Sequence, residues 1–156
     1  MILITGSCGF IGYHLSKFYL KKGIKVIGID NLNNYYDVSF KKKRLSLLKK
    51  DKNFKFFKID LKNENSLNKL GSHKNKIQFI FHLAGQAGVR YSLKNPASYA
   101  KNNIEAYLYL LENFKKSKKL KSIFYASSSS VYGQKKIFKK ENMISVYAVS
   151  KKTLEH

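Results

Sequence analysis

A tyrosine and a lysine near the end of the chain, Tyr147 and Lys151, have types and a spacing that could move a proton. Residues four apart share one face of a helix. A phenol has a reference pKa of about 10, and a nearby ammonium group favours its ionised form. An ordinary amphipathic helix would show the same pair, because lysine is frequent throughout the sequence. The spacing alone therefore leaves both interpretations open.

Three glycines, Gly6, Gly9 and Gly12, follow the first apolar segment in the stretch TGSCGFIG, residues 5–12. Glycine at such positions permits a tight turn, lets a pyrophosphate approach the backbone, and lets the next helix pack closely on the strand. The amides at the start of that helix would face the phosphates, where the helix dipole favours negative charge. The pattern predicts a dinucleotide-binding turn.

Two aspartates end the second and third apolar segments. Asp30 could accept both hydroxyls of an adenosine ribose and would repel a 2′-phosphate, which favours NAD over NADP. An Asx turn at the end of a strand is the alternative explanation of Asp30. Asp60 could bond an adenine amino group or simply form a turn.

These residues need elements to position them, and short and long apolar segments alternate along the chain as in β-α-β units. Strands are predicted at 1–5, 25–30, 54–60, 77–84 and 122–128. Helices are predicted at 10–22, 40–50 and 96–116, with a weak helix at 66–70 and a last helix that starts near Val146. This order predicts an α/β fold with a doubly wound parallel sheet of the Rossmann type.

The composition predicts one globular domain, since 44% of the 156 residues are hydrophobic and 14% aromatic. The single cysteine, Cys8, excludes an internal disulfide, and no Cys/His cluster predicts a metal site. No apolar run is long enough to predict a membrane span, and no basic segment precedes the first apolar one. A signal peptide is therefore not predicted, and a cytoplasmic location fits best.

The net charge of +22 has two interpretations. Clustered basic residues bind nucleic acids, whereas scattered lysines on solvent faces need no partner. Only Arg44 and Arg90 among the 31 basic residues are arginine, the residue that base readout and bidentate phosphate contacts favour. We therefore predict no nucleic-acid partner, although attraction to anionic small molecules remains compatible with the charge.

The sequence resembles the extended short-chain dehydrogenase/reductase family, in particular its NAD-dependent nucleotide-sugar epimerases and dehydratases. The matching residues are TGSCGFIG (5–12), Asp30, Asp60-Leu61, HLAGQAGVR (82–90), Asn102-Asn103, SSSSVYG (127–133) and Tyr147-x-x-x-Lys151. The stretches DNLNNYYDVSFKKKRL, starting at Asp30, and HLAGQAGVRYSLKNPASY (82–99) look most like the UDP-glucuronate 4-epimerase branch, which serves polysaccharide precursor synthesis.

The resemblance implies NAD as the cofactor, a UDP-sugar as the substrate and no metal. The cofactor-binding residues that it implies are Gly6, Gly9, Phe10, Ile11, Gly12, Asp30, Asn31, Asp60, Leu61, Leu83, Ala84, Gly85, Asn102, Tyr147 and Lys151. The implied catalytic residues are Ser128, Tyr147 and Lys151, and the implied substrate contacts are Gln86, Arg90, Ser128, Ser129 and Ser130. Tyr147 would be the base, and Lys151 would bond the nicotinamide ribose. Arg90 could instead only pair with an acid.

The implied reaction is a 4-epimerisation, in which C4 of the sugar is oxidised, the flat 4-keto sugar turns over and the hydride returns to its other face. A UDP-glucose 4-epimerase is one alternative. A dehydratase is another, but it would need a carboxylate pair where this chain has Ser129 and Ser130. A third alternative is a non-catalytic NAD-binding fragment.

Two features depart from the family pattern. The segment from Gly133 to Tyr147 is shorter and has no proline before the tyrosine, and family members are about twice as long. The chain is thus predicted to be an NAD-binding domain, residues 1–156, truncated in the helix that carries Lys151, with the sheet incomplete at its carboxyl-terminal side and the substrate lobe absent. The last strand would keep an open edge, and Lys151 would lie near a fraying, uncapped end. We expect weak NAD binding and little turnover from this chain, and we expect full-length relatives to be homodimers.

Overall fold

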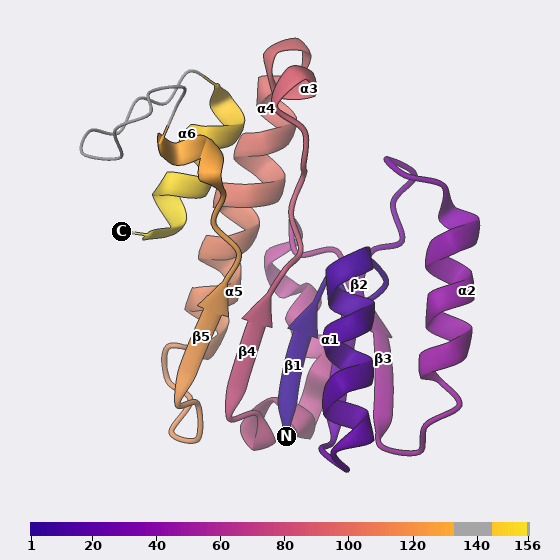
Figure 1. The fold of residues 1–156 in the computed structure, drawn as a ribbon. Helices are drawn as coiled ribbons and strands as arrows, with labels where there is room; N and C mark the ends of the chain where they lie inside the picture. The colour runs from indigo at the N-terminus through magenta and orange to yellow at the C-terminus, as the bar shows by residue number, and fades with distance from the viewer. Residues whose placement is uncertain (133–144, 156) are drawn as a thin grey trace.

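The computed structural model describes residues 1–132 and 145–155. Five parallel strands form one sheet in the order β3-β2-β1-β4-β5 (Figure 1). The strands are β1 (Ile2–Thr5), β2 (Val26–Asp30), β3 (Phe54–Lys58), β4 (Phe79–His82) and β5 (Ser122–Tyr125). The predicted doubly wound parallel sheet is confirmed, with each strand shorter than its predicted range.

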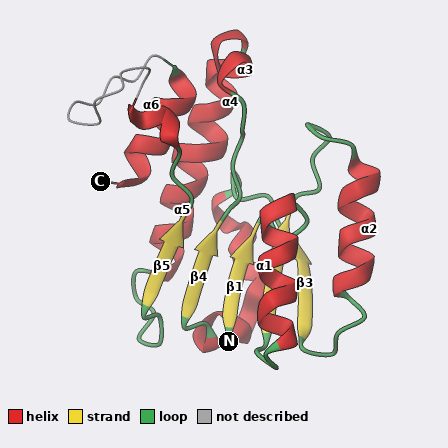
Figure 2. Ribbon diagram, viewed as in Figure 1, coloured by secondary structure: helices red, strands yellow, loops and turns green. Residues whose placement is uncertain are grey.

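Helices cover both faces of the sheet (Figure 2). On one face lie α1 (Phe10–Lys21) and α2 (Val38–Leu48), and on the other lie the 3₁₀ segment η1 (Glu64–Lys76) and α5 (Ala106–Phe114). The remaining segments are α3 (Val89–Lys94), α4 (Pro96–Tyr99), the π-helical η2 (Ala100–Glu105), η3 (Ser129–Tyr132), α6 (Val146–Lys152) and η4 (Thr153–Glu155).

Two apolar cores hold these layers together because side chains alternate across a strand. Ile2 and Ile4 of β1 face the core under α1 and α2, whereas Leu3 faces the core under η1 and α5. All three side chains are almost fully buried. Burying one side chain of this size contributes about 1.5–3 kcal/mol. The two cores therefore determine which face of the sheet each side chain of β1 occupies.

The helix predicted at 96–116 is confirmed as one continuous helical stretch from Pro96 to Phe114, formed by α4, the π-helical η2 and α5. Asn95 has φ −139° and ψ 69°, separates α3 from α4 and accepts the Ser98 amide. Pro96 occupies the first turn of α4, as predicted, and η2 then leads into α5. The sequence analysis missed α3, because six residues are too few to show a helical period. The predicted 66–70 helix is part of η1, which is interrupted at Gly71.

The register of the sheet aligns the carboxyl ends of its central strands. Thr5, the last residue of β1, pairs with Ile29 of β2 and with His82 of β4. The segments that follow these strands therefore leave the sheet at one edge, where ligands bind in open parallel sheets. In Figure 1 this is the upper edge, to which the arrows point.

Residues on both sides of α6 hold that helix against the domain. The Ser145 hydroxyl caps its first turn by accepting the Ala148 amide at 3.1 Å. After the helix Leu154 is buried, and Glu155 accepts hydrogen bonds from Ser127 and from Lys152. Residues 153–155 thus make contacts with the domain, and the expectation of a fraying end after Lys151 stays a prediction. Of the shortened segment 133–147, residues 133–144 lie outside the described residues.

No helix in residues 1–132 and 145–155 has both the length and the apolar character to cross a membrane.

Candidate functional site

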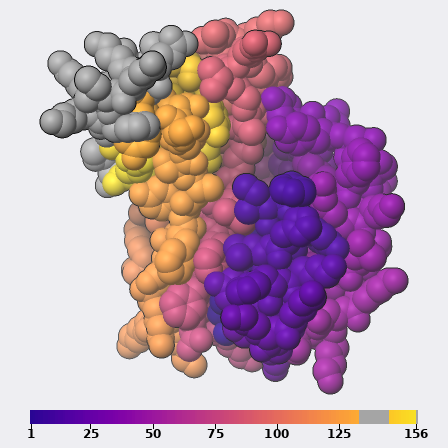
Figure 3. All heavy atoms as spheres, in the orientation of Figure 1, coloured from indigo at the N-terminus to yellow at the C-terminus, as the bar shows by residue number. Residues whose placement is uncertain are grey.

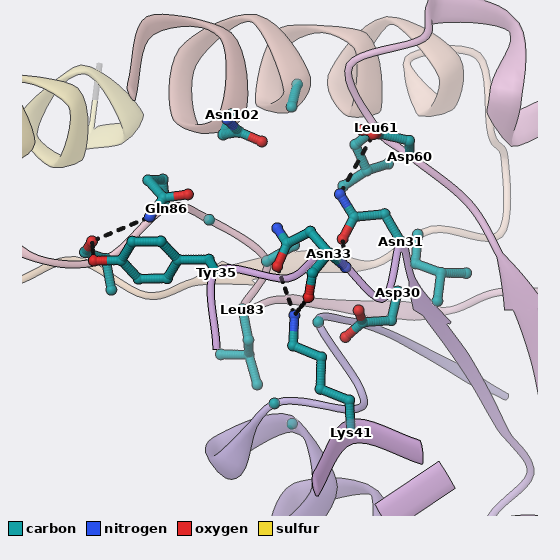
Figure 4. Close-up of a pocket in the computed structure, with 18 of the residues that line it drawn as sticks. Asp30, Asn31, Asn33, Tyr35, Lys41, Asp60, Leu61, Leu83, Gln86 and Asn102 are labelled. Atoms are coloured by element: carbon teal, nitrogen blue, oxygen red, sulfur yellow. Dashed lines mark hydrogen bonds between the residues drawn. The ribbon is translucent and has the colours of Figure 1, made fainter. Parts of the chain in front are cut away.

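A cavity of about 270 Å³ opens at the carboxyl edge of the sheet, between the turn after β1 and the segments after β2, β3 and β4 (Figure 4). In Figure 3 the indigo amino-terminal segment and the rose-coloured α3–α4 region face each other across a recess in the surface. The cavity is lined by Gly6, Gly9, Phe10, Ile11, Gly12, Asp30, Asn31, Asp60, Leu61, Leu83, Ala84, Gly85 and Asn102 from the predicted cofactor set, and by Gln86 from the predicted substrate set. The structure thus brings these residues together, and their contacts with a ligand remain predictions.

The glycine turn supplies free main-chain amides to this cavity. A Cβ on Gly12 would lie 2.2 Å from the Gly6 carbonyl oxygen, so only glycine lets α1 start this close to β1. Gly9 precedes α1 and provides no side-chain cap for its first amides. The side chains of Phe10 and Ile11 are exposed, at 67% and 63%. The first turn of α1 therefore offers amides to an anion.

Asp30 is held so that its carboxylate can still accept further donors. One oxygen accepts the Cys8 amide at 3.1 Å, and the other accepts the Leu32 amide at 2.8 Å. Each oxygen keeps a free lone pair, which suits a pair of ribose hydroxyls. The Asx turn to Leu32 and the ligand-binding interpretation are therefore compatible. Burial raises the pKa of the Cys8 thiol to about 12, so Cys8 fills the turn as a neutral group.

Asp60 also combines the two interpretations that the sequence left open. Its carboxylate accepts the Lys62 amide at 3.1 Å, as a turn former would, and accepts from the Asn31 side chain at 3.4 Å. Both Asn31 and Asp60 line the cavity. The two side chains form the wall at the β2–β3 end of the cavity (Figure 4).

A buried hydrogen-bond network fixes the segment after β4. The Thr5 hydroxyl oxygen accepts the amides of Leu83 and Ala84 at 3.1 and 3.0 Å. Its two lone pairs are then used, so its proton is donated to Nδ1 of His82, 3.0 Å away. Burial lowers the pKa of His82 to about 3, which keeps the ring neutral with its remaining proton on Nε2. His82 therefore helps to fix the end of β4.

Lys151 brings a buried cation to the end of β4. Its side chain is 7% exposed, and Nζ lies 3.4 Å from the place that a Cβ on Gly85 would occupy. Burial lowers its pKa. In the part of the chain that the structure describes, Nζ donates no hydrogen bond. This ammonium group is therefore available to a ligand at the Gly85 side of the cavity.

None of the predicted catalytic residues Ser128, Tyr147 and Lys151 is part of the cavity lining, although Lys151 lies beside Gly85, which is. Tyr147 is half-buried, and its ring meets the Tyr99 ring edge-on with centroids 6.0 Å apart. Ser128 accepts the Ser130 amide at 3.2 Å, just before η3, which packs against α6. Among the described residues no hydrogen bond joins Ser128 to Tyr147. Arg90 is exposed on α3. The structure thus does not bring the serines or Arg90 to the cavity.

Comparison with known proteins identifies the family. Residues 3–156 match the family described as GDP-mannose 4,6 dehydratase. The chain belongs to the NAD-dependent epimerase/dehydratase family. The UDP-glucuronate 4-epimerase of Thermodesulfobacterium geofontis is 44% identical over 98% of this chain and 48% of its own length. Protein CapI of Staphylococcus aureus is 42% identical, over 99% of this chain and 47% of its own length.

A solved structure extends this likeness to the whole fold. The UDP-glucuronic acid 4-epimerase from Bacillus cereus, in complex with UDP-glucuronic acid and NAD, superimposes with a TM-score of 0.88 at 35% identity. The alignment covers 99% of this chain and 50% of that chain. This epimerase/dehydratase family member therefore spans about half the length of the relatives that it matches.

The residues present fit the NAD that the family name implies. The cavity of this epimerase/dehydratase family member has free amides at one strand end, a carboxylate with two open lone pairs at the next, and a buried ammonium group beside Gly85. The amides suit the pyrophosphate of NAD, the carboxylate suits the two hydroxyls of its adenosine ribose, and the ammonium group suits its nicotinamide ribose. No three His, Cys, Asp or Glu side chains within the described ranges gather closely enough for a metal ion.

Asn103 is a site residue to which the sequence analysis gave no role. It is 1% exposed, and its amide pairs with both backbone groups of Gln86, accepting from N at 2.6 Å and donating to O at 3.1 Å. It also donates to the Ser150 hydroxyl at 2.8 Å, which in turn donates to the Tyr147 carbonyl at 2.8 Å. Asn103 thus joins the cavity wall to α6. The Asn102-Asn103 pair was its only signal.

The loop between β2 and α2, residues 31–37, contributes more to the cavity than the sequence indicated. Asn33, Tyr35 and Tyr36 line the cavity together with Lys41 of α2. The Lys41 ammonium group donates to the carbonyl and the side-chain oxygen of Asn33, at 3.1 and 2.7 Å. A polar loop has no period that could have predicted these contacts.

Proposed function

We propose that this chain is the NAD-binding part of a UDP-glucuronate 4-epimerase, which interconverts UDP-glucuronate and UDP-galacturonate. The observation that carries the proposal is the buried Lys151 ammonium group beside Gly85, at the edge of a cavity whose other end has Asp30 and the glycine turn. The likeness to UDP-glucuronate 4-epimerases supports the choice of substrate. NAD, when bound, would take the hydride from C4 of the sugar and return it.

The chain's own groups would bind the cofactor along the cavity. The amides of Phe10 and Ile11 would bind the pyrophosphate, and Asp30 would accept the hydroxyls of the adenosine ribose. Asn31 and Asp60 would contact the adenine, and the Lys151 ammonium group would donate to the nicotinamide ribose. The absence of a 2′-phosphate in NAD suits Asp30, whose negative charge would repel that group.

Proton transfer would depend on α6. Tyr147 would take the proton from the sugar 4-hydroxyl, and Ser128 would hold that hydroxyl. Lys151 lies one helical turn after Tyr147, so both side chains are carried on the same face of α6. The edge-on contact with Tyr99 limits the rotation of the Tyr147 ring. A dehydratase is less well supported, because Ser129 and Ser130 offer no carboxylate pair.

We also propose that cofactor binding and sugar binding belong to different halves of a longer polypeptide. Relatives are about twice as long as the matched region, and we assign most of the grip on the sugar to their remaining half. We also propose a cytoplasmic role in cell-surface polysaccharide precursor synthesis. This chain should therefore bind NAD weakly and convert UDP-glucuronate slowly.

The test compares wild type with Tyr147→Phe. Isothermal titration calorimetry measures the Kd for NAD, and chromatography measures UDP-galacturonate formed in long incubations with stoichiometric chain. The variant should keep its Kd within about twofold, because only a hydroxyl is lost, and should lose at least about 100-fold of any conversion, as expected for a missing general base. Tyr109→Phe, on α5 outside the cavity lining, is the matched control.

Two results would contradict the proposal. The first is a wild-type chain that does not bind NAD at concentrations up to the millimolar range. The second is conversion of UDP-glucuronate that Tyr147→Phe leaves unchanged. In the first case the cavity is not a dinucleotide site, and in the second Tyr147 is not the base.

A further inference from the structure

Tyr35 joins the two sides of the glycine turn. β1 lies between β2 and β4 in the sheet, so the segments after β2 and β4 flank the turn that follows β1. The Tyr35 hydroxyl, from the β2–α2 loop, donates to the Ala87 carbonyl after β4 at 2.9 Å. Tyr35 lies along the cavity with its ring directed toward this segment (Figure 4). Tyr35 and Ala87 both line the cavity, so the contact is part of its wall.

The first half of the β2–α2 loop is anchored on its own side. The Leu32 amide donates to Asp30 at 2.8 Å, and the Asn33 amide donates to Asn31 at 3.1 Å. Lys41 then holds Asn33 through two hydrogen bonds. Within the described residues, Tyr35 makes the one hydrogen bond from this loop to the segment after β4. The second half of the loop thus depends on Tyr35 for its attachment across the cavity.

The segment after β4 is shaped to receive the Tyr35 hydroxyl. Gly88 has φ +100°, and a Cβ at this position would lie 2.7 Å from the Tyr35 hydroxyl oxygen. The Tyr35 ring also packs against the Tyr91 ring of α3, with centroids 5.3 Å apart. Only glycine leaves room for the hydroxyl at position 88, so the two segments are complementary at this contact.

The Tyr99 hydroxyl is a second donor beside the Ala87 carbonyl, so loss of the Tyr35 hydroxyl should not destabilise the fold. The Tyr99 hydroxyl lies 2.7 Å from the Ala87 oxygen and 2.6 Å from the Gly88 oxygen. Burial raises the pKa of Tyr99 to about 12, so this hydroxyl keeps its proton. Without the Tyr35 hydroxyl, the Ala87 carbonyl would still have a donor, and no buried acceptor would be left unpaired.

We propose that Tyr35 is a positioning residue that latches the β2–α2 loop over a dinucleotide bound in the cavity and slows its departure. The inference rests on the proposed function, since it needs NAD as the occupant. A dinucleotide on the glycine turn would lie between the two segments that Tyr35 joins. The Tyr35–Ala87 hydrogen bond would then break before the loop can lift and the ligand can leave.

The test compares Tyr35→Phe with Tyr109→Phe. Both changes remove one tyrosine hydroxyl, but Tyr109 donates to Glu105, and neither of these two residues lines the cavity. Stopped-flow displacement measures the dissociation rate of NAD. Tyr35→Phe should release NAD about three- to tenfold faster, as expected for one hydrogen bond, with a nearly unchanged association rate and melting temperature. Tyr109→Phe should release NAD at the wild-type rate.

Hydrogen exchange without NAD gives a second measurement. The backbone amides of residues 34–37 should exchange faster in Tyr35→Phe than in wild type, because the far attachment of the loop is lost. Unchanged exchange, or NAD binding with an unchanged dissociation rate, would overturn the latch while leaving the proposed function intact. Failure of every variant and of wild type to bind NAD would overturn the proposed function, and the latch with it.

Discussion

At the scale of single residues, burial decides the charge state of the groups around the cavity. Asp30 accepts two main-chain amides, whereas His82 is buried between β1 and the Tyr107 ring, near Lys151. Burial lowers the pKa of both His82 and Lys151. Burial thus acts in the same direction on both basic groups, since it disfavours their protonated forms.

The neutral His82 predicts a pH dependence of stability. Burial, and secondarily Lys151, lowers its pKa to about 3, whereas an unfolded histidine titrates near about 6.5. Below about pH 6.5 the unfolded chain takes up a proton that the folded chain refuses, so the free energy of unfolding falls as the pH falls. The slope should reach about 1.4 kcal/mol per pH unit between about pH 6 and pH 4, measured by urea unfolding.

The exposed His14 provides the control for this prediction. His14→Gln should keep the pH slope, and His82→Gln should lose part of it. If His82→Gln does not fold, an NMR titration of the wild-type ring replaces it. A His82 ring that titrates near its unfolded value would contradict the assignment.

At the scale of elements, the position of α6 depends on contacts with distant segments. Asn103, in the π-helical η2, connects the Gln86 backbone to Ser150 of α6. Helices with a π segment often mark functional sites, because the extra residue redirects a side chain. Just after α6, Leu154 is buried and Glu155 accepts a hydrogen bond from Ser127. The carboxyl-terminal half of the helix that carries Tyr147 and Lys151 is therefore positioned by tertiary contacts.

Removal of the Asn103 side chain tests this link. Asn103→Ala would leave both backbone groups of Gln86 and the Ser150 hydroxyl without their partner, so we expect a loss of about 2–3 kcal/mol in urea unfolding. Ser150→Ala removes only the outer bond and should cost about 1 kcal/mol. Asn75→Ala, at an exposed position, should cost less than about 0.5 kcal/mol. Equal stability of all three variants would show that Asn103 does not hold α6.

At the scale of the whole molecule, positive charge far exceeds negative charge. The 31 Lys and Arg residues face only nine Asp and Glu residues, and the net charge is +22. The ion pairs that the structure describes, such as Lys62–Asp60 and Lys152–Glu155, are local. Unbalanced charge destabilises a compact state through self-repulsion, while it also attracts anionic ligands to the cavity.

Salt should therefore stabilise this protein. Screening lengths fall from about 30 Å at 0.01 M salt to about 10 Å at 0.1 M, so the melting temperature should rise by several degrees over this range of sodium chloride, as followed by circular dichroism. The double variant K118E/K119E, at two exposed lysines of the α5–β5 connection, should show a smaller rise because its net charge is lower. A melting temperature that does not depend on salt would contradict this explanation.

Much of the fold could be predicted because its signals are local. The apolar segments of the five strands and the spacing of Gly6, Gly9 and Gly12 are contiguous in the sequence, and the parallel sheet that they predicted is confirmed. The helix α3 was not predicted, because its six residues are too few to show a helical period. The hydrogen bond from Ser127 to Glu155 could not be predicted, because the two residues lie 28 positions apart in the chain.

By itself the sequence determined the glycine turn, the acid after the second strand and the tyrosine–lysine pair, because residue type and spacing along one segment are enough to define them. Only the tertiary structure decided which of these groups share a cavity, and it left Ser128 and Arg90 outside the cavity lining. It also decided that Tyr35 meets Ala87 and that Asn103 meets Ser150. These partners lie on segments that come together only when the sheet has formed, so no local pattern could encode their contacts.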